Sequence, residues 1–155
     1  KGDSINFFAE RCKNVEIFGF DSFFGLEENW YGFKYKKGYF NLNGAVPKVK
    51  PNVKIYKGLF EEALPNFIEI LGPRKIDIIH LDADTYKPTS FVLKMVSNNL
   101  RDGTIIIFDE FFGYPNFQLH EFKAWEEFQT EFKIEFEYIS FTSMGVAIRI
   151  NYIEN

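Results

Sequence analysis

The chain has 155 residues, a length that suits one domain with a sizeable core and is short for two. Hydrophobic residues make up 46% of it, phenylalanine occurs 20 times, and the formal net charge is −4. This composition excludes an intrinsically disordered chain, and the acidic balance disfavours a nucleic-acid partner. We therefore expect one globular domain over residues 1–155 that binds no nucleic acid.

Cysteine content and hydropathy bear on where the protein works. Cys12 is the only cysteine, so no disulfide can form within the chain. A lone cysteine suits a reducing compartment, and we expect a cytoplasmic protein. No stretch reaches the roughly 18 apolar residues of a membrane span, so we expect no membrane partner.

Short apolar runs alternate with helical patterns along the chain. Strands are predicted at 15–20, 52–58, 76–82 and 103–110. Helices are predicted at 5–12, from Pro65 to Gly72, at 86–100 with Pro88 in its first turn, and within 117–133. This alternation predicts an α/β fold, with a parallel sheet covered by helices on both faces.

Two further segments depart from that alternation. Residues 134–142 and 144–150 are strand patterns with almost nothing between them, which predicts an antiparallel hairpin at or near a sheet edge. The irregular segment 25–51 is rich in glycine, asparagine, lysine and aromatic residues. A loop of this length inside a domain is usually functional or disordered, and we predict a lid or substrate loop.

Polar or small residues follow every predicted parallel strand. They are Asp21, Gly58, the pair Asp82 and Asp84, and the pair Asp109 and Glu110. Ligands of open parallel sheets bind beyond the carboxyl ends of the strands, where these residues should meet. A lone aspartate there is usually a helix cap or a turn residue, but four gathered carboxylates repel unless a cation or proton joins them. Mg²⁺, which prefers oxygen ligands, is the expected cation.

The stretch "DADTY" from Asp82 to Tyr86 also fits a different class of enzyme. Haloacid-dehalogenase-type phosphatases use two aspartates at this spacing, followed later by an acidic pair for Mg²⁺. In that motif threonine or valine normally stands where this chain has Tyr86. The interval between Asp82 and Asp109 holds only one helix, too little for the segments those enzymes carry there. The phosphatase therefore stays an alternative.

Four blocks in order cover nearly the whole chain and resemble the macrocin O-methyltransferase family. They are "FGFDSFFGLEENW", "GAVPKVKPNVKIYKGLFEEALPNF", "IDIIHLDADTYKPTSFVLKMVSNNL" and "GTIIIFDEFFGYPNFQLHEFKAWEEF". The resemblance implies a Rossmann-like class I methyltransferase fold with a seven-stranded sheet. It also implies two cofactors, S-adenosylmethionine (SAM) and Mg²⁺, and a small-molecule substrate, a hydroxyl-bearing sugar or secondary metabolite.

The resemblance assigns roles by position. For SAM binding it implies Gly2, Ser4, Asp21, Ser22, Gly58, Leu59, Phe60 and Asp82. Asp21 would accept hydrogen bonds from the ribose hydroxyls, and residues 58–60 would surround the adenine. The implied metal ligands are Asp82, Asp109 and Glu110, where Glu110 replaces the aspartate that relatives often have.

Asp82 and Asp84 are the expected catalytic residues. A bound Mg²⁺ would hold the acceptor oxygen and lower its pKa, while Asp84 would take the hydroxyl proton as general base. Two other roles for Asp84 stay open: a carboxylate that supports the metal ligands from behind, or the N-cap of the helix near Pro88.

Histidines and loop aromatics supply further candidates. His80 lies in an apolar strand pattern and is expected to be a hydrogen-bonded core residue, whereas His120 would either approach the substrate or cap a helix. Trp30, Tyr31 and Tyr35 would either stack on a sugar or pack within their own loop.

One departure from the family concerns the first strand. Gly2 and Ser4 resemble the end of the glycine-rich turn that follows this strand, so we expect an N-terminally truncated chain that lacks the strand. Strands 15–20 and 76–82 would then pair directly, or a second copy would supply an edge and make the protein a homo-oligomer. A non-catalytic scaffold that keeps the fold is the third alternative function.

Overall fold

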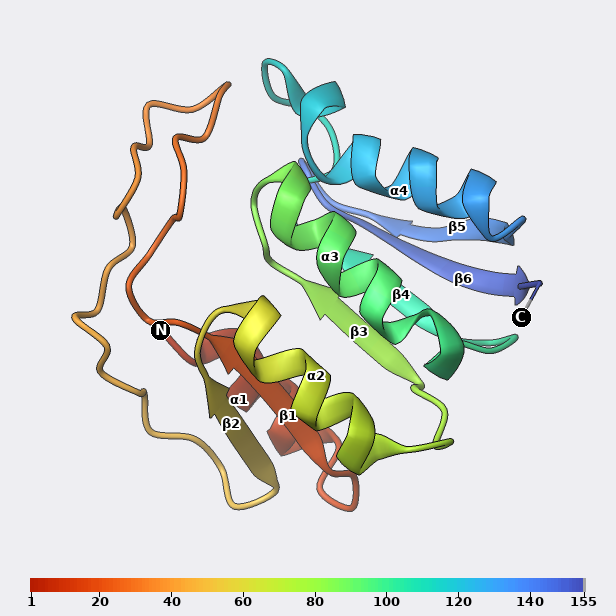
Figure 1. Ribbon diagram of the computed structural model, residues 1–155, viewed down its shortest axis with the longest axis horizontal. Helices are drawn as coiled ribbons and strands as arrows, with labels where there is room; N and C mark the ends of the chain where they lie inside the picture. Colours follow the sequence, from red (N-terminus) through yellow and green to blue (C-terminus); the bar gives the residue numbers. More distant parts are fainter. Residues whose placement is uncertain (155) are drawn as a thin grey trace.

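The computed structural model describes residues 1–154, whose strands form two sheets (Figure 1). The first sheet pairs β1 (Ile17–Asp21) and β2 (Val53–Lys57) in parallel. The second has the order β3-β4-β6-β5, with β3 (Ile78–Leu81), β4 (Ile105–Phe108), β5 (Glu135–Phe141) and β6 (Val146–Tyr152). Strands β3 and β4 are parallel, whereas β6 runs antiparallel to β4 and to β5. The predicted hairpin is thus confirmed, with β5 at the sheet edge.

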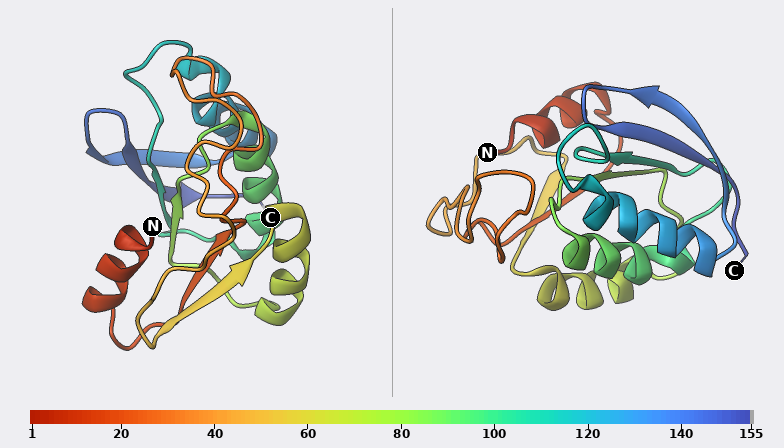
Figure 2. Two further views of the ribbon diagram at one scale, coloured as in Figure 1. Left: turned by 90° about the vertical axis from the view of Figure 1, so that its left-hand side faces the viewer. Right: turned by 90° about the horizontal axis from the view of Figure 1, so that it is seen from above.

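Helices cover both faces of these sheets, as predicted (Figure 2). The α-helices are α1 (Asp3–Arg11), α2 (Phe60–Leu71), α3 (Tyr86–Val96) and α4 (Glu121–Glu131), and two short 3₁₀ helices are η1 (Ser97–Asn99) and η2 (Phe117–Leu119). Helix α1 lies on one face, and α2, α3 and α4 lie side by side on the other. This arrangement is the expected α/β, Rossmann-like architecture. The expected single seven-stranded sheet is not found, because the strands of residues 1–154 form one sheet of two strands and one of four.

The main core lies between the larger sheet and helices α3 and α4. Trp125 and Phe128 of α4 pack there with Phe108 of β4, and all three are almost wholly buried. Burying such a side chain contributes about 1.5–3 kcal/mol to folding. The core therefore holds β4 firmly and fixes the point at which the chain leaves the sheet.

Helix α2 begins earlier than the sequence prediction. Pro65 was expected to open this helix, but it lies inside α2, which starts at Phe60. Interior proline removes a backbone hydrogen bond and disfavours a helix. The apolar face of the helix explains the difference, because its buried residues Leu64, Phe67 and Leu71 continue a stripe that begins at Phe60. Gly72 ends the helix, as predicted.

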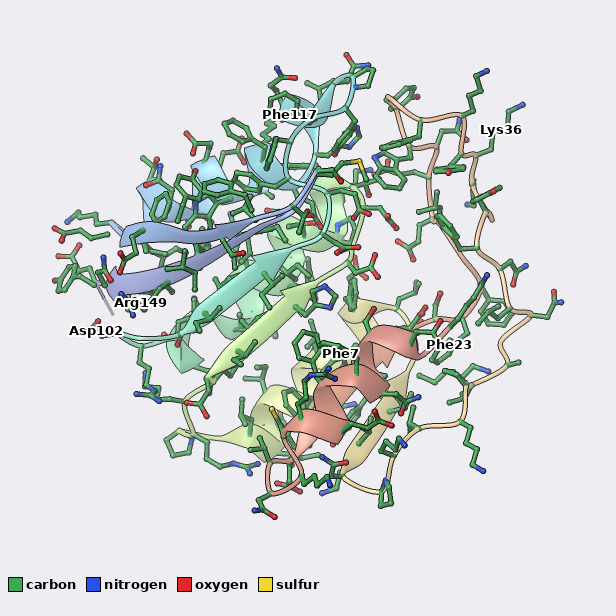
Figure 3. The ribbon with its side chains drawn as sticks, turned by 180° about the vertical axis from the view of Figure 1, so that it is seen from behind. Phe7, Phe23, Lys36, Asp102, Phe117 and Arg149 are labelled. Atoms are coloured by element: carbon green, nitrogen blue, oxygen red, sulfur yellow. The ribbon has the colours of Figure 1, made fainter. Side chains whose placement is uncertain are left out.

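Strands β1 and β3 are not hydrogen-bonded to each other, so the expected direct pairing of these two strands is wrong. Helix α1 packs against both strands instead (Figure 3). The Phe8 ring centroid lies 5.6 Å from that of His80 on β3, and Ile5 lies against Gly19 of β1. Supply of an edge by a second copy stays a prediction.

The predicted lid, residues 25–51, connects β1 to β2 without a helix or named strand of its own (Figure 1). It is fixed near its C-terminal end by Asn6 of α1. The Asn6 amide donates to the Lys48 carbonyl at 3.0 Å, and its oxygen accepts the Lys50 N–H at 3.0 Å. Within residues 1–154, no helix is long and apolar enough to cross a membrane.

Candidate active site

The candidate site lies at the rim where the parallel strands end, which we call the carboxyl rim. Strand register pairs Leu81 of β3 with Phe108 of β4, so the residues that follow them leave the sheet side by side. The Asp109 N–H donates to the Leu81 carbonyl at 3.0 Å and extends the ladder by one step. Asp82 and Asp109 therefore leave the sheet at the same level.

Three carboxyl groups converge at this rim. One oxygen from each of Asp82, Asp84 and Glu110 lies within 4.8 Å of the others. Glu110 is only 9% exposed, and its Oε2 atom has no hydrogen-bond partner among the described residues. A buried carboxylate oxygen without a partner costs free energy, so this position calls for a cation or a proton.

The backbone at Asp84 is unusual for a residue with a side chain. Its φ angle is 62°, in the left-handed region, and the Thr85 N–H donates to the Ala83 carbonyl at 2.6 Å across the tight turn. Such a conformation persists only where the surroundings enforce it, and it is frequent at functional sites. The turn directs the Asp84 carboxyl group toward Asp82 and Glu110.

Burial and mutual repulsion raise the pKa values of this cluster. The pKa of Asp84 rises to about 7 because the group is buried and Asp82, Asp109 and Asp21 lie near it. The pKa of Glu110 rises to about 9, chiefly through burial and then through Glu121 and Asp84. Without a cation, protons would have to neutralise part of this cluster.

Asp82 is exposed at its surface. Its pKa is nevertheless raised, first by the protein atoms that displace water around the carboxyl group and then by the charge of Asp109. Asp109 behaves differently, since the adjacent His80 lowers its pKa. His80 Nε2 lies 3.6 Å from Asp109 Oδ1, an ion-pair distance. His80 was expected to be a hydrogen-bonded core residue; its ring packs against Phe8 and faces Asp109, but it is only partly buried.

The donor set fits Mg²⁺, which takes carboxylate oxygens. The predicted ligands were Asp82, Asp109 and Glu110. The geometry brings Asp82 and Glu110 together with Asp84, whereas Asp109 turns toward His80. Asp82 and Glu110 belong to both sets, so the difference concerns the third ligand alone.

Glu121 is a site residue that sequence reasoning missed. It is the first residue of α4 and is fully buried. Its Oε1 accepts the Ala83 N–H at 3.4 Å and its Oε2 accepts the Glu110 N–H at 3.2 Å. Burial raises its pKa to about 8 against the effect of these two hydrogen bonds. The only sequence signal was an acidic residue at a helix start, a common feature of solvated helix ends.

The residues expected to bind SAM lie at the ends of β1, β2 and α1. Asp21 Oδ1 accepts the Phe23 N–H at 2.7 Å, which orients this carboxylate at the end of β1. Ser22 Oγ accepts the Phe24 N–H at 3.1 Å. Both side chains thus shape the same turn at the carboxyl rim.

The other expected cofactor residues open two helices. Gly58 has a φ of 148° and follows β2, while Leu59 caps α2 and Phe60 is its first residue. Gly2 has a φ of 92° and caps α1, whose second residue is Ser4. A helix N-terminus offers unpaired backbone N–H groups, so these positions suit a polar or anionic ligand.

The loop aromatics form a small second core that joins the lid to the β4–α4 loop. Trp30 is buried, and its ring contacts Phe33 and Tyr114 at centroid distances of 4.4 and 5.9 Å. These aromatics were expected either to stack on a sugar or to pack within their own loop; Trp30 packs within the protein, whereas Tyr31 is exposed. Tyr35 stacks on Phe33 at 5.5 Å.

His120 links the same two segments. It is buried at the start of α4, and its Nε2 lies 2.7 Å from the Tyr31 carbonyl oxygen. Because a carbonyl only accepts, this nitrogen carries the hydrogen. Figure 3 shows the lid, with Lys36, and the β4–α4 loop, with Phe117, at the same end of the molecule.

The chain is similar in fold to solved structures of methyltransferases. The chain matches CalS11, described as a calicheamicin methyltransferase and as a TDP-rhamnose 3′-O-methyltransferase, at 21% identity and a TM-score of 0.65, over 86% of this chain and 60% of that one. It matches the O-methyltransferase NovP at 19% identity and a TM-score of 0.63, over 94% and 64%. A Bacillus cereus O-methyltransferase in complex with SAH matches at 14% identity and a TM-score of 0.50, over 96% and 79%.

These identities show a shared fold. The chain spans about three fifths of the length of CalS11 and of NovP. A search of curated proteins finds no match to it. The model of the methyltransferase domain family, however, matches residues 1–111, which is well over half of the sequence and includes Asp21, Asp82, Asp84 and Glu110. The chain belongs to the methyltransferase domain family.

Proposed function

We propose that this chain carries the site of a SAM- and Mg²⁺-dependent O-methyltransferase that methylates a hydroxyl group of a sugar or secondary metabolite. One observation carries the proposal: Asp82, Asp84 and Glu110 converge at the carboxyl rim, and a buried oxygen of Glu110 lacks a partner. The resemblance to the macrocin O-methyltransferase family supports the finer assignment. The family match favours this function over the phosphatase alternative.

The cofactors would divide the chemistry between them. When bound, SAM would supply an electrophilic methyl group and Mg²⁺ would hold the acceptor oxygen and lower the pKa of its hydroxyl. Asp21 would orient SAM by accepting hydrogen bonds from its ribose hydroxyls, and residues 58–60 would contact the adenine. Alignment of the methyl carbon with the acceptor oxygen supplies much of the catalysis in such a transfer.

Asp84 is the proposed general base. In the metal-free protein, burial and the neighbouring aspartates raise its pKa to about 7, in the range that suits a group that accepts a proton. With SAM bound as methyl donor, the acceptor hydroxyl oxygen would take the methyl group from the sulfonium, and Asp84 would accept the hydroxyl proton. The products are the methyl ether and S-adenosylhomocysteine.

Asp82 and Glu110 are the proposed core of the metal site. The third ligand is Asp109 by family resemblance and Asp84 by the distances within the cluster. If Asp109 is the ligand, Asp84 is left to act as base. If Asp84 is the ligand, the proposed base is instead the pair of His80 and Asp109 at the rim.

The proposed substrate is a small molecule that enters between the carboxyl rim and the lid. The exposed Tyr31 supports a sugar or another flat, hydroxyl-bearing acceptor, because aromatic side chains stack on such surfaces. CalS11 is described as acting on TDP-rhamnose, which makes a nucleotide-linked sugar the first acceptor class to test.

Isothermal titration of S-adenosylhomocysteine, with and without Mg²⁺, tests the cofactor part of the proposal. We expect binding by the wild type and loss of most affinity in Asp21→Ala. Asp102→Ala is the matched control, since Asp102 is an exposed aspartate far from the carboxyl rim (Figure 3). Equal binding by wild type and Asp21→Ala would contradict the assigned cofactor site.

A further inference from the structure

Glu121 stands out among the buried charged groups because the proposed reaction does not use it. It is fully buried at the first position of α4, and charged residues are almost never fully buried unless they are paired. Among the described residues it makes no ion pair. Both of its oxygens instead accept backbone N–H groups, one from the β3–α3 turn and one from the β4–α4 loop.

These two N–H groups belong to the residues that carry the acidic cluster. Ala83 lies between Asp82 and Asp84, and Glu110 contributes its own side chain. One carboxylate thus connects the two backbone segments from which all three clustered side chains project. The hydrogen bonds measure 3.4 Å to Ala83 and 3.2 Å to Glu110.

We infer that Glu121 is a positioning residue of the metal site, which fixes the spacing between Asp82 and Asp84 on one side and Glu110 on the other. This inference rests on the proposed function, since it assigns a role within the same site. Groups behind the direct ligands orient them, and their loss typically lowers metal affinity roughly 10- to 100-fold.

The strained turn at Asp84 gives this role a physical reason. A residue with a side chain avoids a φ of 62° unless neighbouring contacts hold it there. The Ala83 N–H precedes that residue and is held by Glu121. Trp125 and Phe128 anchor helix α4 in the main core. The hydrogen bond from Ala83 to Glu121 therefore attaches the turn to a helix that is itself held firmly.

Glu121→Gln separates positioning from packing. Glutamine has nearly the same size, but it has one accepting oxygen and one donating NH₂ group. It satisfies one of the two backbone N–H groups and places a donor against the other. One of the two segments is therefore released while the volume of the side chain is kept. Glu126→Gln, on the exposed face of α4, is the matched control.

The first measurement is amide hydrogen exchange by NMR on the metal-free protein. We expect the Ala83 and Glu110 amides to be protected in the wild type, and at least one to exchange roughly 10-fold faster or more in Glu121→Gln. The Ile148 amide in β6 should not change, and neither should any of the three in Glu126→Gln. Unchanged exchange of both site amides in Glu121→Gln would overturn the inference. If this variant does not fold, exchange of both amides at solvent rates in the wild type would overturn it.

The second measurement is titration with Mn²⁺ alone, followed by electron paramagnetic resonance. We expect the dissociation constant to rise roughly 10- to 100-fold in Glu121→Gln and to stay constant in Glu126→Gln. Equal Mn²⁺ affinity of wild type and Glu121→Gln would contradict the positioning role. A wild type that binds no Mn²⁺ would refute the metal site itself, and amide exchange would still decide whether Glu121 holds the two segments.

Discussion

His120 Nε2 lies 2.7 Å from the carbonyl oxygen of Tyr31, a contact between residues 89 positions apart in the chain. This hydrogen bond joins the start of α4 to the tip region of the lid. It therefore connects the predicted lid, residues 25–51, with the helix that carries Glu121.

Replacement of His120 should loosen the lid. His120→Ala leaves the Tyr31 carbonyl without its donor, which should cost about 1 kcal/mol of stability. Hydrogen exchange across residues 25–40 should accelerate, as mass spectrometry of the intact protein can measure. His120→Gln retains a donor, so its exchange rates should lie between those of the wild type and those of His120→Ala. Identical exchange in all three proteins would show that this contact does not hold the lid.

Two glycines in the lid offer a matched test of its docking. Both Gly32 and Gly38 have positive φ angles, but a Cβ atom on Gly32 would overlap the carbonyl oxygen of Pro115, whereas one on Gly38 would meet nothing within 4 Å. Gly32→Ala should therefore expose the buried Trp30 and shift its fluorescence to longer wavelength. Gly38→Ala also places a side chain at a positive φ angle but should leave the spectrum unchanged. Equal shifts in the two variants would count against a contact between Gly32 and the Pro115 carbonyl.

The identity of the third metal ligand can be decided with two conservative variants. If Asp84 is the base and Asp109 the ligand, Asp84→Asn should lower kcat roughly 10²–10⁴-fold while Mn²⁺ affinity changes little. Asp109→Asn should then weaken Mn²⁺ binding. The opposite pattern in Mn²⁺ titration would assign the ligand position to Asp84.

The stability of the metal-free protein should fall as pH rises. Burial raises the pKa of Glu110 from its ordinary value of 4.5 to about 9, so between these values the folded state holds a proton that the unfolded state has lost. Raising the pH then favours the unfolded state. Thermal unfolding in a chelator should show a falling Tm from about pH 5 to about pH 9, where the upper limit follows the raised pKa.

Glu110→Gln removes this titration and should make the decline of Tm with pH shallower. Glu126→Gln, an exposed change of the same kind, should keep the wild-type slope. A decline that is equally steep in Glu110→Gln would mean that Glu110 ionises normally and that its buried environment is not as described.

Apolar runs ending in carboxylates made the fold and the rim predictable from sequence. Strand ends at Asp21, Asp82 and Asp109 followed from local patterns, because buried parallel strands are continuous apolar runs and their ends meet at one edge. The start of α2 was misplaced because Pro65 is a strong local signal that the packing of the apolar helix face overrides.

Other features depend on contacts between distant segments. Strands β1 and β3 lie in different sheets with α1 packed against both, an arrangement that no local pattern reports. Glu121 has the sequence signature of a solvated helix start, yet the close approach of the β3–α3 turn and the β4–α4 loop buries it. The contact from His120 to Tyr31 likewise arises only once the lid is folded back.

Mn²⁺ binding, measured by electron paramagnetic resonance on the wild type and on Glu110→Gln, tests directly whether a divalent cation binds at the carboxyl rim. We expect one ion per wild-type chain and an affinity at least tenfold lower in Glu110→Gln, because this variant replaces the buried oxygen that lacks a partner. Failure of the wild type to bind Mn²⁺, or equal affinity in both proteins, would contradict the proposal of a divalent cation at the carboxyl rim.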